Sequence, residues 1–127
     1  MNFRQLLYID DDEDDQELFQ MAIAEIDDAI ECFFELDATN ALQKLIESEW
    51  KPDAIFLDLN MPNMNGREFL KEMRSIQELN EIEVIVLSTS SHPSIVKSLK
   101  EMGVRGFITK PGSYQELVRV LQSCLRS

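Results

Sequence analysis

Short apolar runs alternate with segments of helical periodicity along this 127-residue chain. Residues 6–9, 54–57 and 84–87 are each uninterrupted runs of four apolar residues, and each precedes a segment whose apolar residues recur three or four positions apart. Continuous apolar runs are typical of strands that are covered on both faces. Strands that alternate with helices favour a parallel sheet with right-handed crossovers. The pattern therefore predicts an α/β fold with a doubly wound parallel sheet.

Weaker patterns complete a set of five strand–helix units. Residues 32–36 and 107–108 indicate the second and fifth strands in chain order. Residues at helical spacing mark the apolar faces of five helices, within 18–26, 41–46, 69–73, 95–102 and 117–125. Pro93 favours a helix start and Gly103 a helix end, and the letters SYQE at residues 113–116 fit a capping box.

Length and charge limit what the chain can do. One domain over residues 1–127 fits this length, and we expect it to stand alone, without an output domain. The 24 acidic and 12 basic residues give a formal net charge of −12, and such a surface repels nucleic-acid phosphates and anionic membranes. No apolar run exceeds four residues, which predicts no membrane span and no signal peptide. We expect a cytoplasmic protein that binds neither nucleic acid nor membranes directly.

Polar side chains follow the predicted strands. Asp10 and Asp11 follow the first strand, Asp58 the third, Ser88 the fourth and Lys110 the fifth. In such sheets ligands bind at the carboxyl ends of the strands. Clustered carboxylates need a counter-charge, and oxygen ligands without His or Cys favour Mg²⁺. A carboxylate can also accept a phosphoryl group, whose oxygens a lysine and a hydroxyl can hold.

Four stretches carry a resemblance to a known family: YIDDD at 8–12, IFLDLNMPNMNG at 55–66, VIVLSTSS at 84–91 and GVRGFITKP at 103–111. In this order and spacing the chain resembles the receiver domain of two-component response regulators. The resemblance covers nearly all of the chain and implies a flavodoxin-like sheet of strand order 2-1-3-4-5 with helices on both faces. It implies a phosphorelay protein that is phosphorylated by a sensor histidine kinase or a histidine phosphotransfer protein and then binds a downstream protein. Such a domain is not an enzyme, since it catalyses only its own phosphotransfer and dephosphorylation.

The resemblance gives each residue of this sheet edge a role. Asp58 looks like the phosphoacceptor, and Lys110 is similar to the family's lysine that pairs with the phosphoryl group. Asp11 and Asp58 look like direct Mg²⁺ ligands. The backbone carbonyl of Asn60 is expected to complete the metal site, whereas Asp10 is expected to act through water.

The resemblance also implies a switch. Ser88 matches the switch hydroxyl, and Phe107 matches the switch aromatic. Because Phe107 lacks the hydroxyl of tyrosine, its switching is expected to work by packing. The face formed by the fourth helix, the fifth strand and the fifth helix is expected to change its partner, and it is the face through which a homodimer could form.

Three further positions are expected to modulate the phosphoryl group. Thr89 is bulkier than the small residue that many relatives carry there and is expected to restrict small phosphodonors. Asn60 and Ser90 match positions whose side chains tune phosphoryl lifetime in the family. The resemblance also predicts a cis peptide bond between Lys110 and Pro111, which is a minority state for such bonds.

The six consecutive acids at residues 10–15 are expected to serve two purposes. Asp10 and Asp11 belong to the predicted site. Asp12 is interpreted as loop. Residues 13–15 are expected at the start of a helix, where negative charge meets the positive end of the helix dipole.

Three alternative hypotheses stay open. A calcium-binding loop fits the alternating acids, but Asp15 and Met21 stand where Gly and Glu are needed. A small aspartyl-phosphate phosphohydrolase of the haloacid dehalogenase kind needs Thr or Val where Asp14 stands. A receiver-like module that binds proteins without being phosphorylated differs from the main hypothesis only in its chemistry.

Overall fold

The computed structural model describes residues 3–89 and 92–126. Within these ranges five parallel strands form one sheet in the order β2-β1-β3-β4-β5. The strands are β1 (Gln5–Ile9), β2 (Glu31–Glu35), β3 (Ala54–Leu57), β4 (Glu83–Ser88) and β5 (Gly106–Thr109). The helices of this part of the chain are α1 (Glu13–Ile26), α2 (Ala38–Glu47), α3 (Gly66–Arg74), α4 (Pro93–Glu101) and α5 (Tyr114–Arg126). The predicted fold class and strand order are confirmed.

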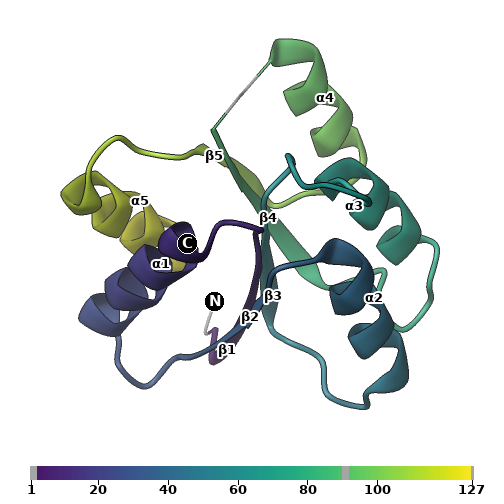
Figure 1. Cartoon of the computed structure of the whole chain (residues 1–127), viewed down its shortest axis with the longest axis horizontal. Coiled ribbons are helices and arrows are strands. Elements are labelled where there is room, and N and C mark those ends of the chain that lie inside the picture. Colours follow the sequence, from purple (N-terminus) through teal and green to yellow (C-terminus); the bar gives the residue numbers. More distant parts are fainter. Residues whose placement is uncertain (1–2, 90–91, 127) are drawn as a thin grey trace.

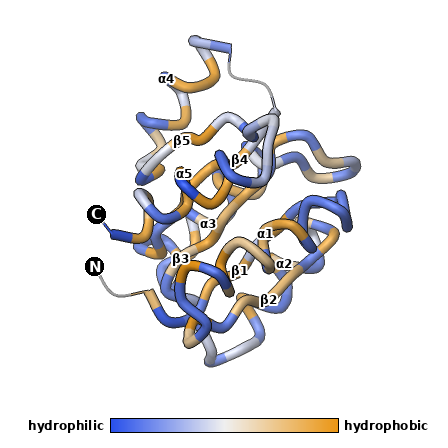
Figure 2. Tube along the Cα trace, turned by 90° about the vertical axis from the view of Figure 1, so that its left-hand side faces the viewer, coloured by the Kyte–Doolittle hydropathy of each residue, from blue (hydrophilic) through white to orange (hydrophobic). Residues whose placement is uncertain are grey.

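Helices cover both faces of the sheet (Figure 1). Helices α1 and α5 lie side by side on one face, and α2, α3 and α4 cover the other. In Figure 2 the central strands are mostly orange, whereas much of the peripheral chain is blue. Because each central strand is covered twice, its sequence reads as a continuous apolar run rather than as an alternation. None of the described helices has the length and apolar character needed to cross a bilayer.

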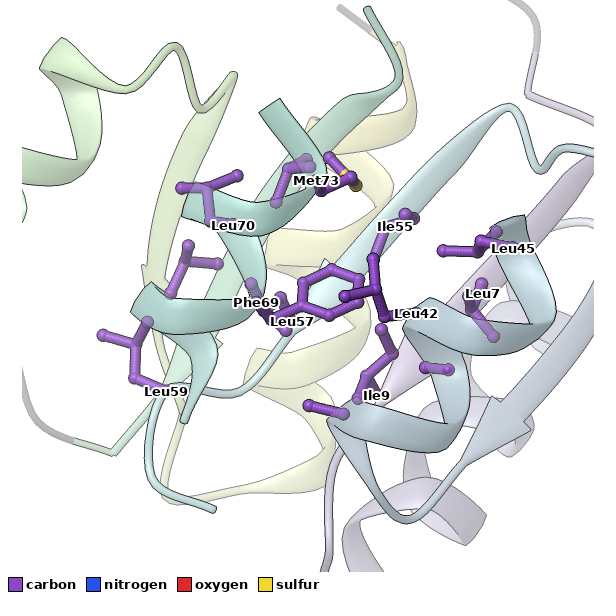
Figure 3. Packing of buried hydrophobic residues seen from close by; sticks show 14 of the residues in the cluster. Leu7, Ile9, Leu42, Leu45, Ile55, Leu57, Leu59, Phe69, Leu70 and Met73 are labelled. Atoms are coloured by element: carbon purple, nitrogen blue, oxygen red, sulfur yellow. The ribbon is translucent and has the colours of Figure 1, made fainter. Parts of the chain in front are cut away.

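A dense apolar core lies on each face of the sheet. Figure 3 shows α3 presenting Phe69, Leu70 and Met73 to the side chains of β3, and all three are fully buried. On the opposite face the ring of Tyr8 lies 4.5 Å from that of Phe19, centroid to centroid. Full burial of one such side chain contributes about 1.5–3 kcal/mol. These cores hold the strands in register and thereby fix the positions of the strand ends.

The start of α3 lies against the chain that leaves β3. Asn65 caps the helix, and its side chain and that of Glu68 each accept a hydrogen bond from the other's backbone N–H. A Cβ atom on Gly66 would lie 2.5 Å from the carbonyl oxygen of Asp58 and 2.8 Å from the Cα of Leu59. Only glycine fits this close approach, so Gly66 sets the distance between α3 and Asp58.

One guanidinium joins the loops at the other end of α3. Arg74 donates hydrogen bonds to the carbonyls of Asn80 (2.8 Å) and Ile82 (2.9 Å), which precede β4. It also donates to the carbonyls of Met102 and Gly103, which follow α4, at 3.2 Å each. The carboxyl end of α4 is therefore tied to α3.

Two local predictions differ from the structure. Pro111 follows a trans peptide bond, since no bond between described residues is cis, and the predicted cis bond is wrong. Trans is the lower-energy isomer of such bonds by about 0.5–1 kcal/mol.

At the start of α5, the backbone N–H of Glu116 donates to Ser113 Oγ at 3.2 Å, as a capping box requires. The Glu116 carboxylate pairs with Arg119 rather than with the backbone of Ser113. The helix start predicted from Pro93 and the helix end predicted from Gly103 are both confirmed for α4.

Candidate functional site

The sheet register brings the predicted site residues to one edge. The backbone N–H of Asp58 donates to the carbonyl of Ile9 at 3.0 Å, which places Asp58 beside Asp10. The backbone N–H of Lys110 donates to the carbonyl of Ser88 at 2.7 Å. Each residue thus continues the ladder of the strand that precedes it.

Three carboxylates meet at this edge. Asp10, Asp11 and Asp58 each offer an oxygen, and these atoms lie within 4.8 Å of one another. Asp10 and Asp58 are buried, and Asp11 is exposed. A set of oxygen donors favours a hard divalent cation over zinc. The exposed side at Asp11 would let such a cation keep part of its water shell, so the residues fit a metal of this kind.

Both oxygens of Asp10 already accept hydrogen bonds. Oδ1 accepts from the backbone N–H of Asp12 at 3.0 Å. Oδ2 accepts from the hydroxyl of Tyr8 at 2.5 Å and from Lys110 Nζ at 2.7 Å. These partners compensate the burial of the charge and orient the carboxylate. They leave it few lone pairs for direct metal binding.

Lys110 is the counter-charge of the cluster. Its Nζ lies 2.7 Å from Asp10, 2.8 Å from Asp15 and 3.7 Å from Asp58, and its side chain is 13% exposed. Burial opposes the charged form, but the hydrogen bonds to Asp10 and Asp15 and the nearby carboxylate charges outweigh it and raise the pKa of Lys110. The ammonium is therefore charged at neutral pH.

Asp58 is in an electrostatic conflict. Burial, followed by the charge of Asp10, raises the pKa of Asp58 from 3.8 to about 6, although Lys110 opposes the change. The side chain remains 6% exposed, so the carboxyl is not sealed from solvent. A cation at this edge would relieve the conflict.

The remaining predicted residues surround this cluster. Ser88 is fully buried, and in residues 3–89 and 92–126 its Oγ is a buried side-chain atom without a hydrogen-bond partner. Phe107 is half-buried and packs against the core under α2, α3 and α4. Asn60 and Thr89 are exposed, and Ser90 lies outside the described residues.

Sequence reasoning missed several members of the site. Asp12 lies in the loop before α1, as predicted, but it is also the N-cap of that helix and accepts hydrogen bonds from two backbone N–H groups of the first turn, a role that was not predicted. An Asp directly before a helix is a known N-cap signal that could have shown this. Asp15 bonds Lys110 across 95 positions of sequence, and the Tyr8 hydroxyl bonds a buried carboxylate. No sequence signal reveals these two contacts.

The calcium-loop hypothesis is wrong. Such a site needs twelve residues of loop with ligands at alternate positions. Here the chain enters α1 at Glu13, so residues from 13 onward are helical. The acids at 13–15 instead lie in the first turn of α1, as predicted.

Comparison with known proteins shows the class to which this fold and site belong. Residues 6–122 match the model of the response regulator receiver domain, and the chain therefore belongs to that family. Receiver domains of this family take part in two-component phosphorelay signalling. Receiver domains bind Mg²⁺ or Mn²⁺ at an acidic pocket, interact with histidine kinases or phosphotransfer proteins, and are in general not classical enzymes.

Particular relatives support this assignment. The chain is 36% identical over 76 residues to the response regulator Rcp1 of Synechocystis sp. This match covers 60% of the chain and 52% of Rcp1. It is 31% identical over 103 residues to the chemotaxis protein CheY1 of Helicobacter pylori. That match covers 81% of the chain and 75% of CheY1. The matched residues span 52% of Rcp1, 46% of DegU of Brevibacillus brevis and 10% of the sensory/regulatory protein RpfC of Xanthomonas campestris, so the chain covers only part of these curated relatives.

Solved structures agree with the whole fold. The phosphorylated cyanobacterial phytochrome response regulator RcpA superposes with a TM-score of 0.88 at 29% identity, over 96% of this chain and 91% of RcpA. The Mn²⁺-bound form of Rcp1 superposes with a TM-score of 0.85 at 28% identity, over 94% of this chain and 90% of Rcp1.

Proposed function

We propose that Asp58 accepts a phosphoryl group from the phosphohistidine of a sensor histidine kinase or a histidine phosphotransfer protein. The supporting observation is the position of its carboxylate, within 4.8 Å of Asp10 and Asp11 and 3.7 Å from Lys110 Nζ. A carboxylate oxygen forms the new O–P bond, the P–N bond to histidine breaks, and the leaving imidazole takes a proton from solvent. The protein catalyses this transfer and the later hydrolysis on its own Asp58 only.

The metal in this proposal is Mg²⁺. Asp11 and Asp58 supply carboxylate ligands, the backbone carbonyl of Asn60 completes the protein ligands, and Asp10 acts through water. The all-oxygen cluster and the two occupied oxygens of Asp10 support this division. Mn²⁺ bound to the related Rcp1 supports a divalent cation. When bound, Mg²⁺ neutralises charge that develops on the phosphoryl oxygens.

Ser88 and Phe107 form the switch in this proposal. The buried hydroxyl of Ser88, which lacks a partner within the described chain, donates to a phosphoryl oxygen on Asp58. Phe107 then repacks into the space that the movement of Ser88 leaves, and Lys110 holds another phosphoryl oxygen. Thr89 and Asn60 are exposed and can control access and lifetime, a role that the sequence also predicts for Ser90.

The switch is read on the surface formed by α4, β5 and α5. In this proposal that surface binds a downstream protein in the cytoplasm, or a second copy of the chain. A local charge event at the strand ends thereby selects between two states of a distant surface.

Phosphorylation of wild-type and variant proteins tests the proposal. The protein is incubated with phosphoramidate and Mg²⁺, and phosphoryl uptake is followed by intact-protein mass. The wild type and Asp14→Asn are expected to take up one group, whereas Asp58→Asn and the wild type in a metal chelator are not. Asp58→Asn taking up phosphate at the wild-type rate would overturn the proposal.

The same experiment separates the alternatives. A wild type that takes up no phosphate would favour a module that binds proteins without phosphorylation, and turnover of a general phosphomonoester would favour a phosphohydrolase. Mass is the better readout than fluorescence. The Trp50 indole bonds Gln5 at the start of β1, whereas Asp58 lies at the opposite end of the strands.

A further inference from the structure

The ammonium of Lys110 is shared unequally among three carboxylates. It has three N–H donors, and its Nζ lies at hydrogen-bond distance from Asp10 (2.7 Å) and Asp15 (2.8 Å). The nearest oxygen of Asp58 is 3.7 Å away, which is beyond a hydrogen bond. Lys110 is therefore directed away from the carboxyl group that the proposed function phosphorylates.

We propose that Asp15 is a positioning residue that holds Lys110 off Asp58, so that a phosphoryl group must compete with Asp15 for the ammonium. This inference rests on the proposed function of Asp58. Asp15 acts through Lys110 and does not contact the phosphoryl group itself. Its role is to weaken capture of phosphate by the resting protein.

Asp15, and not Asp10, is the partner that Lys110 can release. Asp10 is fully buried and is also held by the hydroxyl of Tyr8 and a backbone N–H. Removing the ammonium from Asp10 would leave a buried charge undercompensated. The side chain of Asp15 is 32% exposed, so water can replace Lys110 there at little cost.

The surroundings allow the exchange. Asp12 Oδ1 accepts a hydrogen bond from the backbone N–H of Asp15 at 3.2 Å, which fixes the residue in the first turn of α1. A cavity of about 130 Å³ borders both Asp15 and Lys110 and is lined further by Leu18 and Pro111. The two side chains therefore have room to separate while the backbone of α1 stays in place.

Binding of a phosphoryl analogue tests the inference. Beryllofluoride is titrated calorimetrically, at saturating Mg²⁺, into the wild type, Asp15→Asn and Asp14→Asn. Asp14 is the matched control because it is exposed, lies in the same helical turn and loses the same charge. Asp15→Asn is expected to bind beryllofluoride roughly three- to fivefold more tightly than Asp14→Asn and the wild type, the effect of losing one partly exposed ion pair.

Two further measurements distinguish positioning from a general effect of charge or folding. Mg²⁺ titrated alone is expected to bind Asp15→Asn and Asp14→Asn with the same affinity. Asp15→Glu, which keeps the carboxylate, is expected to restore the wild-type affinity for beryllofluoride. If Asp15→Asn does not fold, Asp15→Ser replaces it as a second neutral variant.

The outcomes separate the two proposals. If the wild type binds beryllofluoride and a neutral Asp15 variant binds it no more tightly than Asp14→Asn, the inference about Asp15 is overturned while the role of Asp58 stands. If the wild type does not bind beryllofluoride with Mg²⁺ at all, the proposed function fails, and the inference fails with it.

Discussion

Replacing Asp58 by asparagine should stabilise the metal-free protein, and the gain should depend on pH. The pKa of Asp58 is raised from 3.8 to about 6, first by burial and then by the charge of Asp10. The folded protein therefore holds this proton more tightly than the unfolded chain. The contribution of Asp58 to the free energy of unfolding therefore falls as the pH rises from about 4 to about 6, and above pH 6 it no longer changes. The difference between the two pKa values corresponds to a loss of roughly 3 kcal/mol in the free energy of unfolding above pH 6.

Urea unfolding in a metal chelator measures this effect. At pH 7.5 Asp58→Asn is expected to be more stable than the wild type by roughly 2–3 kcal/mol, since the neutral amide does not repel Asp10. At pH 4 the wild-type carboxyl is itself protonated, and the difference should approach zero. Adding Mg²⁺ at ten times its dissociation constant should stabilise the wild type by about 1.4 kcal/mol but not Asp58→Asn.

A variant outside the carboxylate cluster of Asp10, Asp11 and Asp58 provides the control. Asp14 is exposed and lies in the first turn of α1, so Asp14→Asn is expected to change stability by less than about 0.5 kcal/mol at each pH. The electrostatic reasoning is refuted if Asp58→Asn gains no stability at pH 7.5. It is equally refuted if the gain is as large at pH 4 as at pH 7.5.

Two other substitutions test how the site is held. Gly66→Ala places a Cβ 2.5 Å from the carbonyl of Asp58, so we expect a loss of about 1–3 kcal/mol in urea unfolding and slower phosphoryl uptake in the mass assay. Tyr8→Phe removes the buried 2.5 Å hydrogen bond to Asp10, and we expect urea unfolding to show a loss of about 1.5–3 kcal/mol.

Each of these two substitutions has a matched control. A Cβ on Gly112 meets nothing within 4 Å, so Gly112→Ala should leave stability within about 0.5 kcal/mol of the wild type. The hydroxyl of Tyr114 donates to Glu25 at an exposed site, and Tyr114→Phe should also be nearly neutral. If a variant and its control unfolded at the same urea concentration, the structural explanation of that position would be wrong.

The fold could be predicted because its strands and helices differ in apolar period. β1, β3 and β4 read as uninterrupted apolar runs because helices cover both of their faces. The meeting of Asp10 with Asp58 could be predicted as well. Both directly follow strands that are neighbours in a parallel sheet, and such strands end at the same edge.

Contacts that depend on the relative placement of helices could not be predicted. Asp15 reaches Lys110 only because α1 packs beside α5 and directs its first turn toward the end of β5. The sequence around Asp15 is equally consistent with an ordinary acidic helix start. The trans bond before Pro111 shows a different limit, because a family resemblance transfers a typical backbone state that this structure does not adopt.

The hydrogen bonds of Arg74 determine how α4 can respond to an event at the strand ends. They anchor the carboxyl end of this helix to α3, near the end of the strands that lies opposite Asp58. The amino end of α4, at Pro93, follows β4 and therefore lies toward the end of the sheet at which Asp58 lies. The second half of α4 is also held by the hydrogen bond from Arg67 of α3 to Ser98 and by the buried side chain of Leu99, so we expect displacement of the helix to grow toward its amino end. Under the proposed switch, we expect movement of Ser88 and Phe107 to tilt α4 about its carboxyl end rather than to slide it, so that the surface near Pro93 changes most.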